Sequence, residues 1–292
     1  MSEFVYIVAE GVQDVAFLGR LLVLFHQAQR VRRLEDLREP HRTWMGSFTW
    51  PIRGRNGTEI DRLAVPAPTF YALPSGGTVV LRSAEGLDKL RNVLVLDREA
   101  FDRTGTHPDT IGVVLDSDDK DAAERMAALA KVLTDEGLPA PDQLAVVREG
   151  KPRIGAFVLP EPGVPGTLED LLLQIADRSY PTLAASARGF ADHWRQQAAG
   201  LTGADWKAIK KPAGARKAAV AAVTAILRPG YAAQMAIEQS EWIRPDSNAL
   251  PALARCLGFF DALLMTTPPT TPPAPTTATP GDQATSVPER AP

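Results

Sequence analysis

The sequence has few residues that can crosslink it or bind a transition metal. Its 292 residues include one cysteine, Cys256, and four histidines. A single cysteine excludes a disulfide within the chain and fits a reducing compartment. The histidines show no ligand spacing with that cysteine, which argues against a structural zinc site. We therefore interpret Cys256, which lies within the apolar run LARCLGFFDALL, as a buried packing residue.

Long apolar runs and nucleotide-binding loops are also missing. No apolar stretch approaches the roughly 18 residues that a membrane-spanning helix needs, and the start MSEFVYIVAEG does not resemble a signal peptide. We therefore expect a cytoplasmic protein without a membrane partner. The absence of a P-loop argues against a conventional ATPase. The formal net charge of -3 predicts no bulk attraction to nucleic acid, so any such binding must come from a local patch.

Short apolar runs alternate with amphipathic segments along the chain. Apolar residues make up 45% of the sequence, which is ordinary for a globular protein and is ample for a core. Runs such as FVYIVA at 4–9 and IGVVL at 111–115 are typical of strands that are covered on both faces. Helical patterns follow both runs. The alternation predicts an α/β domain around a mostly parallel central sheet.

Composition divides the chain into parts. We expect the α/β domain over residues 1–180, with an Arg-, Pro- and Gly-rich insertion at 28–75 after the first helix. Residues 181–265 are alanine-rich and are predicted to form a helical C-terminal extension packed on that domain. Residues 266–292 are rich in Pro and Thr and nearly devoid of large apolar side chains, which predicts a disordered tail.

Acidic residues follow three of the predicted strands. They are Glu10 after FVYIVA, Asp116, Asp118 and Asp119 after IGVVL, and Glu161 after RIGAFVLP. The carboxyl ends of parallel strands form the edge where α/β sheets bind ligands, so these carboxylates should converge. Close carboxylates repel one another, and oxygen ligands of this kind suit Mg²⁺ or Mn²⁺. The sequence therefore predicts a site for a divalent cation.

Each acid also has a structural interpretation that the sequence leaves open. Asp119 can cap the following helix, and Glu10 and Glu169 can stabilise the positive end of a helix dipole. Asp116 is harder to explain in this way, because it directly follows an apolar run and precedes the cap position. Glu10 and Asp14 are four residues apart, so both can face the same side of one helical turn.

The acidic motifs together resemble the Toprim domain, which is shared by topoisomerases, primases and nucleases of the OLD (overcoming lysogenisation defect) family. The matching stretches are VAEG with Glu10 and VVLDSDD with Asp116 and Asp118, each at the end of a predicted strand. The pair Glu10 and Asp14 also looks like the OLD arrangement. The resemblance covers roughly residues 3–265.

A further motif makes the sequence most similar to small stand-alone Toprim proteins. In that group a strand ending in Pro leads through a loop to a Gly-x-Leu-Glu-Asp helix. Here the stretch GAFVLPEPGVPGTLEDLLL places Gly166, Glu169 and Asp170 in that pattern. The resemblance implies a Toprim-like Rossmannoid fold for the α/β domain.

The resemblance also implies a metal-dependent nuclease that cleaves phosphodiester bonds in DNA or RNA, with an expected role in phage defence or DNA repair. Asp116 and Asp118 would hold one Mg²⁺ or Mn²⁺ ion. Glu10, with Asp14 and Glu169, would hold a second ion or act as general base and acid.

OLD-type sites also use a lysine against the charge that develops on the phosphate, and Lys217 is the candidate chosen here. Basic residues near it are expected to contact a nucleic-acid backbone, namely Lys207, Lys210, Lys211 and Arg216. The insertion also carries aromatic residues between its arginines, for which a small core is the favoured interpretation and base stacking the alternative: Trp44, Phe48 and Trp50.

Other functions remain open at this point. OLD-type enzymes join an ATPase to the Toprim domain, so an ATPase of the ABC/SMC-like type on another chain is an expected partner. The alternative function is a non-catalytic Toprim binding or regulatory subunit that works with such an ATPase. A receiver-like domain whose aspartates bind Mg²⁺ is a weaker reading, because it leaves Glu169 unexplained.

Deleting residues 266–292 should leave the fold and any activity intact, because a segment without large apolar side chains contributes nothing to a core. Thermal unfolding of the full and truncated chains, measured side by side, should give the same midpoint. A lower midpoint or a lost activity in the truncated chain would show that the tail docks on the rest of the protein.

Overall fold

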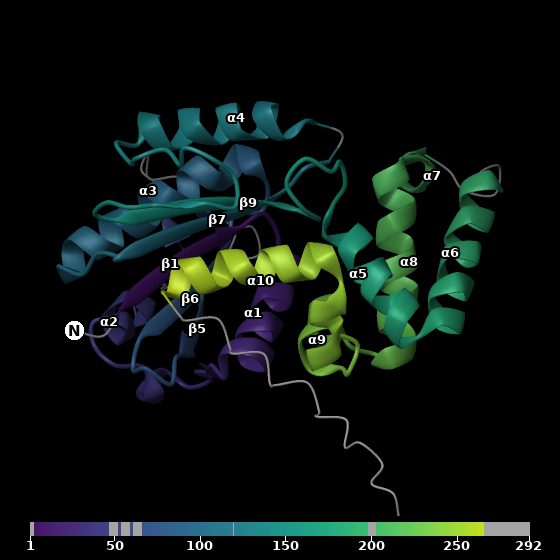
Figure 1. Ribbon diagram of the computed structural model, residues 1–292, viewed down its shortest axis with the longest axis horizontal. Helices are drawn as coiled ribbons and strands as arrows, with labels where there is room; N and C mark the ends of the chain where they lie inside the picture. Colours follow the sequence, from purple (N-terminus) through teal and green to yellow (C-terminus); the bar gives the residue numbers. More distant parts are fainter. Residues whose placement is uncertain are drawn as a thin grey trace, which may run out of the picture.

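The computed structural model describes residues 3–46, 52–53, 59–60, 66–118, 120–197 and 203–265, which build an α/β sheet with helices on both faces (Figure 1). In spatial order the seven strands are β2 (Gln29–Arg30), β5 (Thr69–Ala72), β6 (Thr78–Ser83), β1 (Phe4–Ala9), β7 (Thr110–Asp116), β9 (Arg153–Leu159) and β8 (Val147–Arg148). The four strands from β6 to β9 in this order are parallel, and the remaining strands are antiparallel at the edges. The predicted α/β class and mostly parallel sheet are confirmed.

Helices form the layers on and beside this sheet. The helices of the α/β part are α1 (Val12–His26), α2 (His41–Gly46), α3 (Leu87–Thr104), α4 (Ala122–Asp135) and α5 (Leu168–Ser179), with the short 3-10 helix η1 (Leu34–Asp36). The predicted helical C-terminal part contains α6 (Pro181–Gln196), α7 (Gly203–Lys210), α8 (Pro212–Leu227), α9 (Ala233–Gln239), η4 (Pro245–Ala249) and α10 (Pro251–Leu264). A separate two-stranded ribbon joins β3 (Ile52–Arg53) to β4 (Glu59–Ile60).

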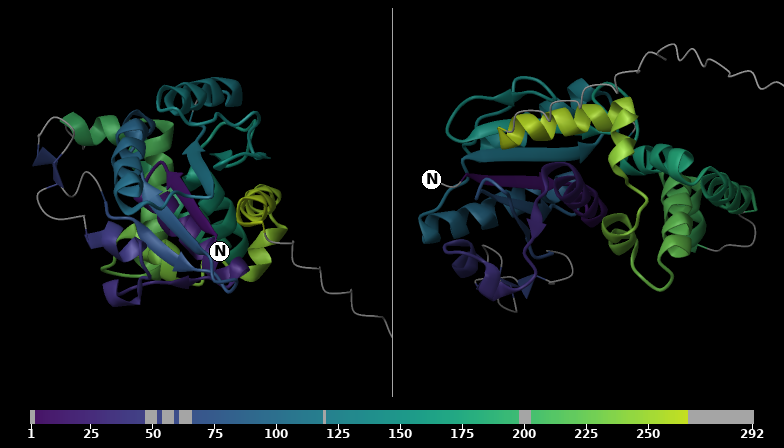
Figure 2. Two further views of the ribbon diagram at one scale, coloured as in Figure 1. Left: turned by 90° about the vertical axis from the view of Figure 1, so that its left-hand side faces the viewer. Right: turned by 60° about the horizontal axis from the view of Figure 1, so that its bottom comes forward.

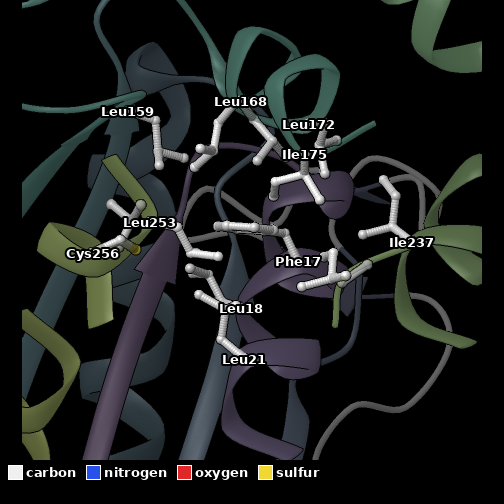
Figure 3. Packing of buried hydrophobic residues seen from close by; sticks show 14 of the residues in the cluster. Phe17, Leu18, Leu21, Leu159, Leu168, Leu172, Ile175, Ile237, Leu253 and Cys256 are labelled. Carbon is white, nitrogen blue, oxygen red and sulfur yellow. The ribbon is translucent and has the colours of Figure 1, made fainter. Parts of the chain in front are cut away.

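The central strand β1 separates two apolar cores. Its side chains alternate between the faces of the sheet, because successive residues of a strand point in opposite directions. Val5 and Ile7 belong to the core shared with α1, α5, α8 and α10, whereas Tyr6 and Val8 belong to the core under α3 and α4. Figure 3 shows the first of these cores around Phe17, with Cys256 among its members. The prediction of Cys256 as a packing residue is confirmed.

The predicted insertion after α1 extends the sheet, since it supplies β2 and β5. Its aromatic residue Trp44 is 2% exposed and packs on Phe70 and Phe101, with ring centroids 5.5 and 5.0 Å apart. The favoured interpretation, a small core, is therefore confirmed for Trp44, and the alternative that it stacks on nucleic-acid bases is wrong. Phe48 and Trp50 lie outside the described residues.

The C-terminal helices share the core of the α/β part. Figures 1 and 2 show α6, α7 and α8 beside the sheet, next to α5, and α10 returning across one face. On that face Phe259 of α10 packs on Phe157 of β9 with ring centroids 5.5 Å apart, in a space that Gly155 leaves open. The predicted tail at 266–292 lies outside the described residues. Among the helices described here, none has the length and apolar character needed to cross a membrane.

Replacing Phe259 with Ala should destabilise the protein by about 3–5 kcal/mol, because the ring is fully buried and its removal leaves a cavity. Urea unfolding measures the change. Phe190→Ala is the matched control, since the same side chain on α6 is 57% exposed and its loss should cost no more than about 0.5 kcal/mol. Equal effects of the two substitutions would contradict the packing of α10 on the sheet.

Candidate functional site

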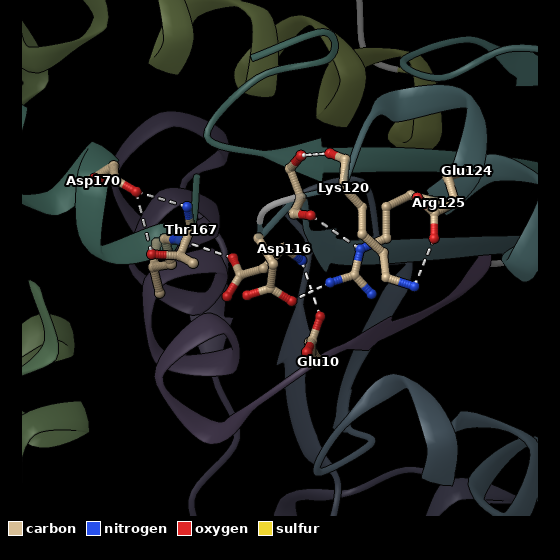
Figure 4. Close-up of polar contacts among 10 residues, drawn as sticks. Glu10, Asp116, Lys120, Glu124, Arg125, Thr167 and Asp170 are labelled. Carbon is tan, nitrogen blue, oxygen red and sulfur yellow. Dashed lines mark hydrogen bonds and ion pairs between the residues drawn. The ribbon is translucent and has the colours of Figure 1, made fainter. Parts of the chain in front are cut away.

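The carboxyl ends of β1 and β7 bring the two main predicted acids together. Ala9 pairs with Val114 in register, and the Glu10 N–H donates to the Val114 carbonyl at 3.0 Å. The Asp116 N–H then donates to Glu10 Oε2 at 3.1 Å, a contact that Figure 4 shows. The predicted convergence of acids at the strand ends therefore holds for Glu10 and Asp116.

A cavity of about 330 Å³ opens at this edge of the sheet. The residues predicted from sequence that line it are Glu10, Asp14, Asp116, Glu169 and Lys217. They come from the ends of β1 and β7, the first turns of α1 and α5, and the start of α8. The other lining residues are Gly11, Val12, Gln13, Glu85, Gly86 and Leu168. Residues more than 200 positions apart in the sequence thus meet in one cavity.

The loop before α5 fixes the position of Asp116. The Leu168 N–H donates to Asp116 Oδ1 at 2.8 Å, and the Thr167 N–H donates to Asp170 Oδ2 at the same distance. Gly166 has φ +148°, and a Cβ atom there would lie 2.7 Å from Asp170 Oδ2. The Gly-x-Leu-Glu-Asp stretch therefore needs its glycine, because any side chain would push the helix start away from the cavity.

Three helices point their N-terminal ends at the cavity. Gly11 precedes α1, Gly86 precedes α3, and Leu168 opens α5, and all three residues line the cavity. Unpaired N–H groups and the helix dipole make such ends favourable for anions. They therefore stabilise the carboxylates that lie there and favour the approach of a phosphate group.

Burial and mutual repulsion make ionisation of the acids unfavourable. Burial, followed by the charges of Glu10 and Glu169, raises the pKa of Asp14 from its usual 3.8 to about 7. Burial, and then Asp14, Glu10 and Glu169, raises the pKa of Asp116 well above its usual range. Burial also raises the pKa of Glu10, although the hydrogen bond from the Asp116 N–H acts in the other direction. The pKa of Asp14 lies where a group can both accept and release a proton at neutral pH.

Two buried oxygen atoms of the cavity have no hydrogen-bond partner. They are Oδ1 of Asp14 and Oε2 of Glu169, on residues that are 5% and 4% exposed. A buried carboxylate oxygen without a donor is costly, so both atoms are suited to a cation. In the described part of the chain, no three His, Cys, Asp or Glu side chains already surround a common point where an ion would sit.

Asp118 does not line the cavity, although, after burial, its charge contributes to the raised pKa of Glu10. Its φ of 52° is left-handed, its backbone bridges to Gly166, and its carboxylate forms an ion pair with Arg125. Its expected role as a metal ligand beside Asp116 thus needs a movement away from Arg125, and it stays a prediction. The helix cap is Asp121, which accepts from the Glu124 N–H at 2.7 Å.

Two other acids of the sequence pattern fall outside this arrangement. Asp119, the residue considered as a helix cap, lies outside the described residues. Glu161, which follows β9, forms an ion pair with Arg255 of α10. Convergence at the strand ends therefore holds for β1 and β7 but does not extend to the acid after β9.

The basic residues near Lys217 occupy different environments. Lys207, Lys210 and Lys211 are exposed on α7 and at the start of α8, and the Lys210 ammonium lies 4.3 Å from the centre of the Trp206 ring. Arg216 forms an ion pair with Asp170 at 3.2 Å. The exposed lysines are available to a backbone phosphate, whereas Arg216 also holds α8 against the start of α5.

The sequence interpretation missed Glu85. This residue follows β6, the other neighbour of β1, and lines the same cavity. A signal was present, because Ala84-Glu85-Gly86 repeats the Ala-Glu-Gly of residues 9–11 at the end of a strand.

The chain belongs to the family described as "Protein of unknown function (DUF3226)", whose model matches residues 5–260. A solved structure described as hypothetical protein PH0156 from Pyrococcus horikoshii OT3 is similar over 90% of this chain and 96% of that chain. The two share 17% sequence identity, with a TM-score of 0.48. No curated protein matches the chain. The function must therefore be argued from the site itself.

Replacing Asp14 with Asn should weaken the pH dependence of stability in cation-free buffer. Because the folded-state pKa of about 7 lies above the usual 3.8, the folded state binds the proton more tightly than the unfolded state does. The stability that this proton contributes is fully present below about pH 4, falls as the pH rises, and is lost above about pH 7. Urea unfolding from pH 4 to 8 should show that loss in the wild type and a smaller loss in Asp14→Asn.

The control for this prediction is Asp142→Asn, because the Asp142 side chain is 73% exposed and does not line the cavity. It should follow the wild-type curve. An Asp14→Asn variant as pH-dependent as the wild type would contradict the raised pKa.

Proposed function

We propose that this DUF3226 family member is a Mg²⁺- or Mn²⁺-dependent nuclease with a Toprim-like site at the carboxyl ends of β1 and β7. One observation carries the proposal: carboxylates from four elements, of which Asp14 and Glu169 are buried, line a single cavity together with Lys217. Most of the residues to which the Toprim resemblance gave a role in metal binding or catalysis line this cavity, and Asp118 does not: Glu10, Asp14, Asp116, Glu169 and Lys217. Carboxylates that repel one another and yet share one cavity are typical of a functional site.

The donor set of the cavity fits a divalent cation. Its oxygens are carboxylates, the ligands that Mg²⁺ and Mn²⁺ prefer, and two of them are buried without a partner. Glu10, Asp116 and the unpartnered oxygen of Glu169 would hold the ion, and Asp14 lines the cavity beside them. When bound, such an ion stabilises negative charge on a phosphate and lowers the pKa of a water molecule.

The chain's own residues supply the remaining parts of a hydrolytic site. Asp14, whose pKa burial and the charges of Glu10 and Glu169 raise, is the residue placed to take a proton from an attacking water and release it to a leaving oxygen. Lys217 brings a positive charge to the cavity, where it can meet the charge of the phosphate. The N-terminal ends of α1, α3 and α5 orient N–H groups toward the same space.

The charge distribution supports a nucleic acid as the substrate. Residues 181–228 contain eight lysines and arginines and two aspartates, although the whole chain has a net charge of -3. A basic segment beside an acidic cavity suits a polyanion whose backbone lies on the helices while one phosphate enters the cavity. Lys207, Lys210 and Lys211 are the exposed residues proposed for that contact.

Purified protein should cleave labelled DNA or RNA with Mn²⁺ or Mg²⁺ but not with EDTA. Glu10→Ala and Asp116→Ala should each reduce cleavage by orders of magnitude, and the double variant should add little, because residues of one catalytic unit are not additive. Lys217→Ala should also reduce cleavage. Asp142→Ala should cleave as the wild type does.

The Asp118→Ala variant tests whether Asp118 binds the ion or only pairs with Arg125. A loss equal to that of Asp116→Ala would mean that Asp118 leaves Arg125 to bind the ion, whereas a small loss supports the ion pair as its role. A protein that binds nucleic acid but cleaves none under any of these conditions would contradict the nuclease and favour the non-catalytic binding subunit.

A further inference from the structure

A second cavity of about 340 Å³ lies between α5, α6 and α8, which Figure 1 shows next to one another. Glu169 of α5 and Lys217 of α8 line the acidic cavity described above, whereas their neighbours in sequence, Asp170 and Arg216, line the second one. Consecutive residues of a helix point about 100° apart, so α5 and α8 each form a wall of both cavities. One extended molecule can therefore reach both.

The second cavity differs from the first in its charges. The acidic cavity is lined by five carboxylic acids and one lysine. The charged residues of the second cavity are three arginines and two aspartates: Arg188, Arg195, Arg216, Asp170 and Asp192. Pro212, at the start of the 16-residue helix α8, also lines it, so the positive end of that helix faces the cavity. This lining suits an anion.

Arg188 holds the walls of the second cavity together. Its Nη2 donates to Asp177 Oδ2 at 2.7 Å and to the Leu173 carbonyl at 3.3 Å, both on α5. Asp192 follows one turn later on the same side of α6, so its charge and that of Arg188 offset each other. These contacts tie α6 to α5 and leave the other two arginines as the groups that face a ligand.

Arg195 and Arg216 keep N–H donors for such a ligand. Within the described residues, Arg195 is exposed near the end of α6 and forms no hydrogen bond or ion pair. Nε of Arg216 is buried 3.2 Å from Asp170 Oδ2 but has no hydrogen-bond partner there. That oxygen already accepts from the Thr167 N–H at 2.8 Å. A guanidinium carries five N–H donors in a planar fork that matches phosphate, so the chemistry of these two arginines points to a phosphate group.

We infer that the second cavity binds a phosphate of the same nucleic-acid strand, next to the phosphate that enters the acidic cavity. The inference rests on the proposed function for the identity of the first phosphate. It also narrows the substrate class, because a neighbouring phosphate exists in a polynucleotide and not in a simple phosphodiester. Arg195 and Arg216 are then positioning residues, which bind the strand away from the reacting atoms.

The test compares two substrates in the presence of Mn²⁺: a DNA oligonucleotide and bis(para-nitrophenyl) phosphate, which has a single phosphate. Arg195→Gln should raise the KM for the oligonucleotide about tenfold, because it removes a charged hydrogen bond to phosphate. Hydrolysis of bis(para-nitrophenyl) phosphate should stay as in the wild type. Arg216→Gln should act in the same way, and Arg216→Lys, which keeps the charge, should recover part of the loss.

A binding measurement reports on the second cavity without cleavage. In Ca²⁺, the anisotropy of a fluorescent oligonucleotide gives the affinity at several salt concentrations. Arg195→Gln should bind more weakly and lower the slope of log affinity against log salt by about 1, since one phosphate contact is lost. Arg178→Gln is the matched control, because Arg178 is an exposed arginine of α5 that does not line the cavity. It should bind as the wild type does.

The two proposals fail in different ways. A wild type that cleaves the oligonucleotide, with KM, affinity and salt slope unchanged in Arg195→Gln and Arg216→Gln, contradicts only the second phosphate. A wild type that cleaves nothing, but whose binding is weakened by Arg195→Gln, contradicts only the nuclease. Equal losses on both substrates would also overturn the inference, because the arginines would then act on the reacting phosphate or on the fold.

Discussion

The burial of several carboxylates beside one another is the constraint on which the functional edge of this protein depends. Asp14 is 5% exposed, and its ionisation is opposed both by burial and by the charges of Glu10 and Glu169. A buried carboxylate is tolerated only where hydrogen bonds or an opposite charge offset the free-energy cost of its burial. Here the offset comes from backbone N–H groups: the Gly11 N–H donates to Asp14, the Asp116 N–H to Glu10, and the Leu168 N–H to Asp116. The hydrogen bonds leave Oδ1 of Asp14 and Oε2 of Glu169 without a partner, which is the basis of the cation site proposed above.

The topology of the sheet follows the same constraint. Because β6, β1 and β7 are parallel neighbours, their carboxyl ends meet at one edge, and the helices that follow β1 and β6 begin there with their positive ends. The edge is then closed by segments that come much later in the chain. α5 supplies Glu169 and the N–H that holds Asp116, and α8 supplies Lys217. The C-terminal helices thus belong to the site as well as to the core.

Charge is separated between the two sides of this cavity. The acids come from the strand ends and the first turns of α1 and α5, whereas the basic residues are concentrated between residues 181 and 228. The ion pair of Arg216 with Asp170 joins the two sides at their boundary. An anionic chain held on the basic side would bring a phosphate to the acids only with cations between them, which links the proposed substrate to the proposed metal requirement.

The sequence by itself determined the parallel strands and the residues that must end them. Apolar runs define β1 and β7, and acids placed directly after such runs have to meet at the edge of a parallel sheet, so Glu10 and Asp116 were predictable. Only the tertiary structure decided the rest, because it depends on contacts between distant segments. A left-handed turn directs Asp118 to Arg125, and Phe101 buries Trp44. The packing of α8 on α5 brings Lys217, the lysine already chosen from the sequence, into the cavity. Glu85 joins the site for the same reason, since nothing local to it reveals that β6 lies beside β1.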